Sequence, residues 1–182
     1  MLEVSFSPFP ELLTERLRLR AVTVSDAVPL FAMRSDPRIM VHIGRPMAVT
    51  IDDALNLIDT MTKNHEANDG LTWAITIRSD DTMIGAIGYY RLKKEHYRGE
   101  VGYMLAMDHW RKGIMREALA AVVQCGFNRL GFHSIEAITS PENTASNALL
   151  ASCGFIREGL FKEDFFWNGE FRDSAHWSKL AK

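Results

Sequence analysis

The stretch His109-Trp110-Arg111-Lys112-Gly113-Ile114-Met115-Arg116 decides the fold, because it joins a strand-like run to a long apolar helix through a glycine. A helix start carries unpaired N–H groups and the positive end of the helix dipole, so each cation there normally costs about 0.3–1 kcal/mol. Three cations nevertheless crowd this turn, against two carboxylates: Arg111, Lys112 and Arg116 against Asp108 and Glu117. A bound anion, most simply a phosphate, would convert this conflict into a binding site.

The segments on either side of the turn form a βαβ unit. Residues 100–106 have the alternation of a strand, residues 113–130 are helical and nearly all apolar, and residues 134–139 form a second short strand. A helical crossover of this kind makes the two strands parallel. Because the polar stripe of the helix is narrow (Glu117, Gln124 and Asn128), most of its surface should be buried against a sheet.

The remaining elements follow from alternation, cap residues and turn signals. Strands are expected over residues 12–20, 71–77 and 83–92 and, in a hairpin joined by Asn168-Gly169, over residues 155–167 and 170–180. Helices are expected over residues 27–33, which Asp36-Pro37 closes, over residues 50–65, and from Asn143 to the stop at Gly154. The sequence therefore predicts an α/β (α+β) fold with a mixed, mostly antiparallel sheet of about seven strands and helices on both faces.

Composition limits the possible function classes. A chain of 182 residues with 47% hydrophobic and 24% charged residues suits one compact domain, which we place over residues 1–182. Lysine and arginine total 21 against 23 acidic residues, so the basic excess typical of direct nucleic-acid binding is lacking. Residues 1–8 show no basic region followed by a long apolar run. We therefore expect a cytoplasmic protein without a nucleic-acid or membrane partner.

The cysteines and histidines give no signal of a metal site. Cys125 and Cys153 lie in apolar, helix-like runs, where we expect reduced core residues. The six histidines lack the spacing of metal ligands, so no metal is expected. Neither cysteine lies in a motif that indicates a covalent acyl-enzyme.

The order of these segments resembles the GNAT superfamily of acetyl-CoA-dependent N-acetyltransferases, and within it the RimJ/RimL branch, the ribosomal-protein N-terminal acetyltransferases and their relatives. The resemblance runs from about Leu12 to Leu180. The segments that carry it are Leu13–Arg20, Gly99–Leu105, Trp110–Ala118, Pro141–Asn147, Cys153–Phe155 and Asn168–Asp173. It implies a GNAT fold whose central sheet is splayed at the acetyl-CoA site, and it is compatible with a homodimer.

The resemblance also implies which residues hold acetyl-CoA. The family's pyrophosphate loop, Gln/Arg-x-x-Gly-x-Gly/Ala, maps onto residues 110–115, with Trp110 in place of the leading residue and Met115 in place of the second small one. Backbone N–H groups remain available there if Met115 points into the core. The implied cofactor-binding residues are Arg111, Lys112, Gly113, Ile114, Met115 and Arg116 in the loop, Met104, Leu105 and Ala106 on the splayed strand, and Asn143 beside the pantetheine arm.

Two residues are candidates for proton transfer. Glu100 shares a strand face with Gly102 and Met104, and its carboxylate could take the proton of an amine directly or through water. Alternatively it is a solvent-exposed charge at the end of a strand. Ser146 lies about one helical turn after Asn143. In relatives a hydroxyl near this position can protonate the departing thiolate, whereas a serine in a first helical turn can also be merely solvated.

The predicted activity is direct transfer of an acetyl group from acetyl-CoA to a primary amine, with both substrates bound together. The acceptor is the N-terminal α-amine of a protein such as a ribosomal protein, or alternatively a small molecule (amino acid, polyamine or aminoglycoside). A noncatalytic CoA-binding protein is the rival of a different class. The aromatic residues Phe161, Phe165, Phe166 and Trp167, with Trp73 and Trp177, either line an acceptor pocket or pack within the sheet.

Overall fold

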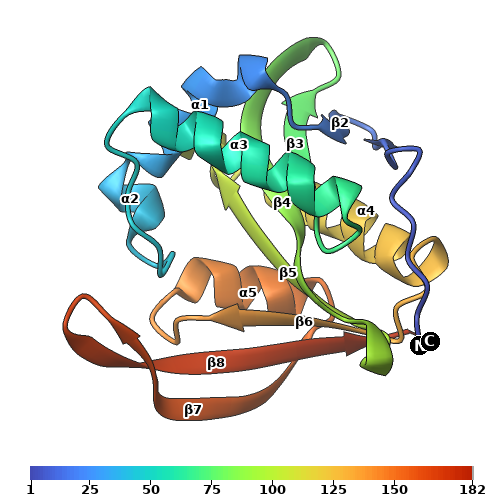
Figure 1. The fold of residues 1–182 in the computed structure, drawn as a ribbon. Coiled ribbons are helices and arrows are strands. Elements are labelled where there is room, and N and C mark those ends of the chain that lie inside the picture. The colour runs from blue at the N-terminus through green and yellow to red at the C-terminus, as the bar shows by residue number, and fades with distance from the viewer. Residues whose placement is uncertain (182) are drawn as a thin grey trace.

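A computed structural model describes residues 1–181 and contains one eight-stranded sheet in the order β1-β2-β3-β4-β5-β6-β8-β7 (Figure 1). The strands are β1 (Leu12–Leu13), β2 (Leu17–Ala21), β3 (Leu71–Ile77), β4 (Asp80–Lys93), β5 (Arg98–Leu105), β6 (Ser134–Thr139), β7 (Ile156–Trp167) and β8 (Glu170–Leu180). The helices are α1 (Ala27–Arg34), α2 (Pro37–Met40), α3 (Ile51–Glu66), α4 (Ile114–Asn128) and α5 (Thr144–Ser152), with short 3-10 turns η1 (Val24–Asp26), η2 (Lys94–His96) and η3 (Met107–His109).

The pairing confirms the predicted mixed sheet. Strands β5 and β6 run parallel, and the other neighbouring strands pair antiparallel. Along the chain α4 lies between the two parallel strands, as the predicted βαβ unit requires. No helix within residues 1–181 is both long enough and apolar enough to cross a membrane.

Two details of the N-terminal third differ from expectation. The strand expected over residues 12–20 is two antiparallel strands, because the Thr14 hydroxyl accepts the N–H of Leu17 at 2.9 Å and closes a turn. Asp36-Pro37 does not simply close a helix; it also begins α2. The Asp36 carboxylate accepts the N–H of Arg38 at 2.9 Å, and Pro37 occupies the first helical position, where its missing N–H costs nothing.

The two faces of the sheet carry separate core clusters. On one face, Leu119 and Val122 of α4 belong to a cluster with Trp73 and Ile87, each with no exposed surface, and Leu150 of α5 belongs to the same cluster. On the other face, α1 and α3 pack over side chains of β3 and β4. Figure 1 shows α3 and α4 on opposite sides of the sheet. Within residues 1–181, α1 and α3 lie over the half of the sheet that contains β3 and β4.

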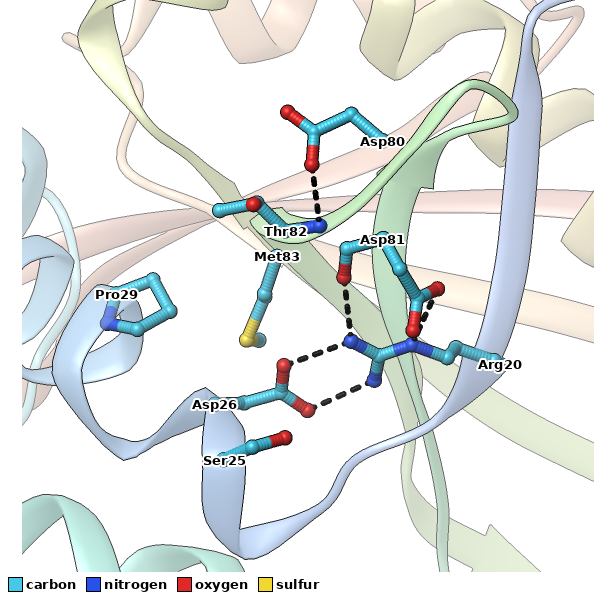
Figure 2. Close-up of a pocket in the computed structure, with 8 residues that line it drawn as sticks. All are labelled: Arg20, Ser25, Asp26, Pro29, Asp80, Asp81, Thr82 and Met83. Carbon is cyan, nitrogen blue, oxygen red and sulfur yellow. Dashed lines mark hydrogen bonds and ion pairs between the residues drawn. The ribbon is translucent and has the colours of Figure 1, made fainter.

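A buried ion pair joins three of these elements (Figure 2). The Arg20 guanidinium donates to both carboxylate oxygens of Asp26, each at 2.8 Å, and to Asp81 at 2.9 Å. Burial raises the pKa of the Asp26 carboxyl, but the hydrogen bonds from Arg20 and Thr23 lower it by more, and the result lies below the usual value. The pair therefore connects β2, η1 and the β3–β4 hairpin.

Candidate active site

The central feature of the site is a split in the sheet between β5 and β6. The two strands pair at only three positions, the last of which is Glu100 beside Glu136. Beyond that point β5 continues to Leu105 on β4, and β6 continues to Thr139 on β8. Each strand keeps one hydrogen-bonded neighbour, so the divergence visible in Figure 1 leaves the inner edges of both strands unpaired with each other.

One main-chain donor points into this split. The N–H of Ala106 donates to the carbonyl of Ile84 at 2.8 Å, and successive peptide groups of a strand point to opposite sides. The N–H of Leu105 is therefore directed away from β4, toward the split. The carbonyl of Leu105 accepts the indole N–H of Trp110 at 2.8 Å, so Trp110 ties the following turn to the end of β5.

The turn from β5 to α4 is built on left-handed backbone. Arg111 has φ +58° and Gly113 has φ +75°, and Gly113 is the N-cap of α4 without a side-chain cap. The first N–H groups of the helix are therefore left for another acceptor. Met115 is 9% exposed and belongs to the core cluster of α4, so its side chain lies in the interior rather than in the turn.

The turn is strongly positive. Arg111, Lys112 and Arg116 are exposed, and within residues 1–181 none has a carboxylate within 4.0 Å. Glu117 does not neutralise them, because Arg16 binds it at 2.7 Å. Burial raises the pKa of the Glu117 carboxyl, but hydrogen bonds from Thr14 and Arg16 lower it by more, so it stays ionised.

Arg16 is a residue of this site that the sequence did not identify. Its guanidinium also donates to the carbonyl of Lys112 at 2.9 Å, and it lies 3.4 Å from the position that a Cβ on Gly113 would take. It therefore belongs to the turn and compensates the charge of Glu117 there. Arg16 lies in the segment Leu13–Arg20, which carries part of the family resemblance. Nothing in the local sequence of that segment connects Arg16 with Lys112, 96 residues away.

The first turn of α5 faces Tyr103 of β5. Asn143 caps the helix by accepting the N–H of Ser146 at 3.0 Å, which confirms its structural role. The Ser146 hydroxyl lies 2.7 Å from the Tyr103 phenol oxygen. Burial raises the pKa of Tyr103 to about 12, although the hydrogen bond with Ser146 lowers it in part, so the phenol keeps its proton.

Glu100 lies on the opposite face of the sheet from Tyr103. Val101 and Leu105 are buried in the cluster that contains α4, so by strand alternation Glu100 and Gly102 face away from α4. The Glu100 carboxylate accepts from Arg91 at 3.0 Å and is 18% exposed. The two predicted proton-transfer residues, Glu100 and Ser146, are thus not neighbours: they flank the split from its two sides.

On the face of Glu100 the site is bordered by the β7–β8 hairpin. Its phenylalanines are exposed, Phe161 (51%), Phe165 (41%), Phe166 (58%) and Phe171 (66%), although they contact other aromatic rings of the hairpin, as in the Phe166–Phe171 pair at 4.9 Å. Trp73 and Trp177, at 0% and 9%, are core residues. A methyl group on Gly44 would collide with the ring of Phe165, so the hairpin touches the α2–α3 connection.

Comparison with known proteins agrees with this geometry. Residues 16–156 match the model of the acetyltransferase (GNAT) domain. The chain is 35% identical to the uncharacterized N-acetyltransferase YoaA of Bacillus subtilis over 93% of this chain and 96% of that protein. It is 24% identical to the ribosomal-protein-serine acetyltransferase of Escherichia coli over 92% and 94% of the two chains.

Similarity of the fold points to the same family. The crystal structure of a GNAT-family acetyltransferase from Bacillus anthracis superposes with a TM-score of 0.84 at 26% identity, over 94% of this chain and 98% of that chain. A β-strand split beside a positive helix start suits acetyl-CoA, the acetyl donor of this family. The chain therefore belongs to the GNAT acetyltransferase family and is an acetyl-CoA-dependent N-acetyltransferase.

Proposed function

We propose that this enzyme transfers the acetyl group directly to the α-amine at the N-terminus of a peptide or protein, such as a ribosomal protein. The observation that carries the proposal is the split between β5 and β6, which has the α4 turn and Ser146 on one face and Glu100 on the other. A donor bound along the first face and an amine approaching from the second would meet in the split. Holding both reactants in this way supplies much of the rate acceleration.

In this proposal the chain holds acetyl-CoA by main-chain groups and cations. The N–H groups from Arg111 to Arg116 face the pyrophosphate, with the burial of Ile114 and Met115 keeping both side chains out of the way. Met104, Leu105 and Ala106 contact the donor through the backbone, and Asn143 contacts the pantetheine arm through the amide group that its cap leaves free. Bound acetyl-CoA supplies an acetyl group activated as a thioester.

The residues around the split then divide the chemistry. The N–H of Leu105 stabilises negative charge on the carbonyl oxygen, a contribution of about 2.7–4 kcal/mol for one donor. Ser146 gives a proton to the departing sulfur, and the phenol at 2.7 Å orients its hydroxyl. Glu100 takes the proton of the amine, directly or through a water molecule.

The shape of the acceptor side supports an extended acceptor rather than an enclosed small molecule. The hairpin carries four exposed phenylalanines, and one of them, Phe165, lies against Gly44 of the α2–α3 connection on the acceptor side. Aromatic side chains give large contact area at low entropic cost, which suits side chains of a peptide. The similarity to an enzyme named a ribosomal-protein-serine acetyltransferase supports the same choice.

The test follows thiol release from acetyl-CoA with a panel of amines. The panel contains peptides that begin with Ser or Ala, the same peptides with a blocked N-terminus, free amino acids, spermidine and an aminoglycoside. Calorimetry measures acetyl-CoA binding separately. We expect release with free-amine peptides and none with blocked peptides. Selectivity for one small amine would contradict the peptide proposal, and binding without release for any amine would indicate a noncatalytic protein.

The variant Ser146→Ala tests the leaving-group role. We expect kcat to fall about 10-fold or more, because the sulfur loses its proton donor, while acetyl-CoA affinity stays within about 3-fold. Ser152→Ala is the matched control, since Ser152 lies at the exposed end of the same helix and bonds only to the carbonyl of Leu149 and, weakly, to Cys153. Equal kcat in the two variants would exclude Ser146 from proton transfer.

A further inference from the structure

Two arginines without acidic partners lie at the edge of the acceptor side. Arg34, the last residue of α1, donates to the carbonyl of Pro46 at 2.8 Å, and the N–H of Ala48 donates back to the carbonyl of Arg34 at 3.0 Å. These bonds hold the α2–α3 connection against the end of α1. Arg45 directly precedes Pro46, whose carbonyl accepts from Arg34, so the two cations lie close together.

Nothing within residues 1–181 neutralises this pair. Neither guanidinium has a carboxylate within 4.0 Å, whereas nearby Arg38 is paired with Asp36 at 2.6 Å. Burial and the positive charge of Arg45 lower the pKa of Arg34, with a partial offset from Tyr90. Two cations held together without an anion are unfavourable, and most of the ten N–H donors of two guanidinium groups remain free for a ligand.

The pair is connected to the reaction site by two contacts. The ring of Tyr90 covers Gly102 of β5, since a Cβ on Gly102 would lie 3.0 Å from it, and Gly102 is on the face of Glu100. Gly44, next to Arg45, touches Phe165 of the hairpin. The arginines therefore border the same open face as the carboxylate that would meet the amine, with Tyr90 between them.

We propose that Arg34 and Arg45 bind a carboxylate of the acceptor, so that the substrate class is an amine with a carboxylate close to it. The inference rests on the proposed acetyl transfer and narrows it. Glu100 receives the ammonium or amine end and the arginines receive the acidic end. Two sources share this chemistry: an acidic side chain next to the N-terminus of a peptide, and the α-carboxylate of a free amino acid.

The experiment compares acid and amide members of matched pairs. One pair is Ser-Asp-Gly-Ala amide and Ser-Asn-Gly-Ala amide, and the other is serine and serinamide. Thiol release gives kcat/KM for each with wild type, Arg34→Lys, Arg45→Gln and the double variant Arg34→Gln/Arg45→Gln. Arg45 is exposed, so Arg45→Gln tests the site even if replacement of Arg34 impairs folding. Arg38→Gln is the control, because it removes a neighbouring cation that already has a partner.

We expect the acid member of at least one pair to have a kcat/KM about 10-fold above its amide, as for one or two hydrogen bonds between charged groups. The advantage of the acid member should fall to about 3-fold or less in the double variant and persist in Arg38→Gln. None of these substitutions should change the KM for acetyl-CoA. The pair that shows the effect identifies the source of the carboxylate.

Equal kcat/KM for acid and amide members in wild type, or an advantage that survives in the double variant, overturns the assignment. If no member releases thiol, the proposed transfer fails for these amines, and calorimetric binding to the CoA-saturated protein replaces the rate in the same comparison. Equal or undetectable binding of both members then overturns the arginine site as well.

Discussion

In the proposed mechanism, proton control at the split depends on one pair of hydroxyl groups. Tyr103 and Ser146 lie 2.7 Å apart, and burial raises the pKa of Tyr103 to about 12. At this pKa the phenol stays protonated across the neutral range, so it remains available as a hydrogen-bond donor. In the proposed mechanism Tyr103 is a positioning residue: its phenol can donate to the Ser146 oxygen and so leave the serine proton to face the sulfur.

Tyr103→Phe removes only this donor. We expect kcat to fall about 3- to 10-fold, the value of one neutral hydrogen bond, with the KM for acetyl-CoA nearly unchanged. Since the pKa is about 12, the wild-type rate should show no alkaline loss from Tyr103 between about pH 6 and 10. The solvent isotope effect on kcat should change in the variant. Tyr97→Phe, which changes an exposed tyrosine just before β5, is the control, and identical rates for both variants would refute the role.

At the scale of single elements, the turn before α4 is the proposed donor site, and it consists of a few residues. Left-handed backbone at Arg111 and Gly113 turns the chain from β5 into the helix. This geometry exposes the N–H groups of the helix start, and the flanking cations add attraction for phosphates. Glycine at position 113 serves both the conformation and the close approach of an anion.

Gly113→Asp should separate binding from folding. A side chain in left-handed backbone costs about 1–2 kcal/mol, which a carboxylate at a helix start partly offsets, whereas the same carboxylate repels the cofactor phosphates. We expect the Kd for acetyl-CoA to rise about 10-fold or more. Gly131→Asp is the matched control, because Gly131 also has a positive φ (+73°) but lies after the C-terminal end of α4. Calorimetry measures the Kd for acetyl-CoA, and urea unfolding measures the free energy of unfolding. An unchanged Kd in Gly113→Asp would count against a phosphate site.

The Arg20–Asp26 pair fixes another element junction. Both side chains are nearly buried, at 8% and 3% exposure, and Asp81 supplies a third charge at the surface. Breaking one partner leaves an uncompensated charge in the interior, while replacing both by apolar residues is often tolerated. The junction therefore depends on the two residues as a unit.

We predict that Asp26→Asn lowers the free energy of unfolding by about 3 kcal/mol, and that Arg20→Met/Asp26→Leu costs less than the sum of its single variants. Because the folded-state pKa of Asp26 lies below its usual value, its contribution is present at neutral pH and disappears as pH falls through the lowered pKa. Urea titrations at neutral and acidic pH check this, and Asp81→Asn is the exposed control. The coupling would be refuted if the stability costs of the single variants simply added in the double variant, and if the difference in unfolding free energy between wild type and Asp26→Asn stayed the same at acidic pH.

At the scale of the whole molecule, the larger of the two core clusters contains residues from nearly the entire length of the chain. The cluster beneath α4 contains Phe6 near the N-terminus and Trp177 near the C-terminus. Strand β6 joins the two halves of the sheet by pairing with β5 and β8. Because neither half can bury its apolar face alone, the chain should unfold as one unit.

This expectation is tested by equilibrium unfolding. Far-ultraviolet circular dichroism reports secondary structure, and tryptophan fluorescence reports the buried Trp73 and Trp177. We expect the two signals to give coincident, single transitions in urea. Two separated transitions would show that residues 1–182 contain more than one cooperative domain.

Much of this organisation could be predicted from local pattern. The apolar period of residues 114–128, the glycines at positions 113 and 131, and the Asn168-Gly169 turn each place an element with little reference to the rest of the chain. The proposed donor side could be predicted for the same reason, since its turn is one continuous segment whose charge conflict is visible in the sequence. The parallel pairing of β5 and β6 followed from the crossover between them.

The sequence by itself determined the family, the order of elements and the turn proposed to hold the donor, because these depend on neighbouring residues. The tertiary structure alone decided which distant side chains meet: Arg16 with Glu117, 101 positions apart, and Tyr103 with Ser146, 43 apart. It also put Glu100 and Ser146 on opposite sides of the split and brought Phe165 onto Gly44. Such contacts depend on strand register and on the packing of helices across a sheet, and neither leaves a local mark in the sequence.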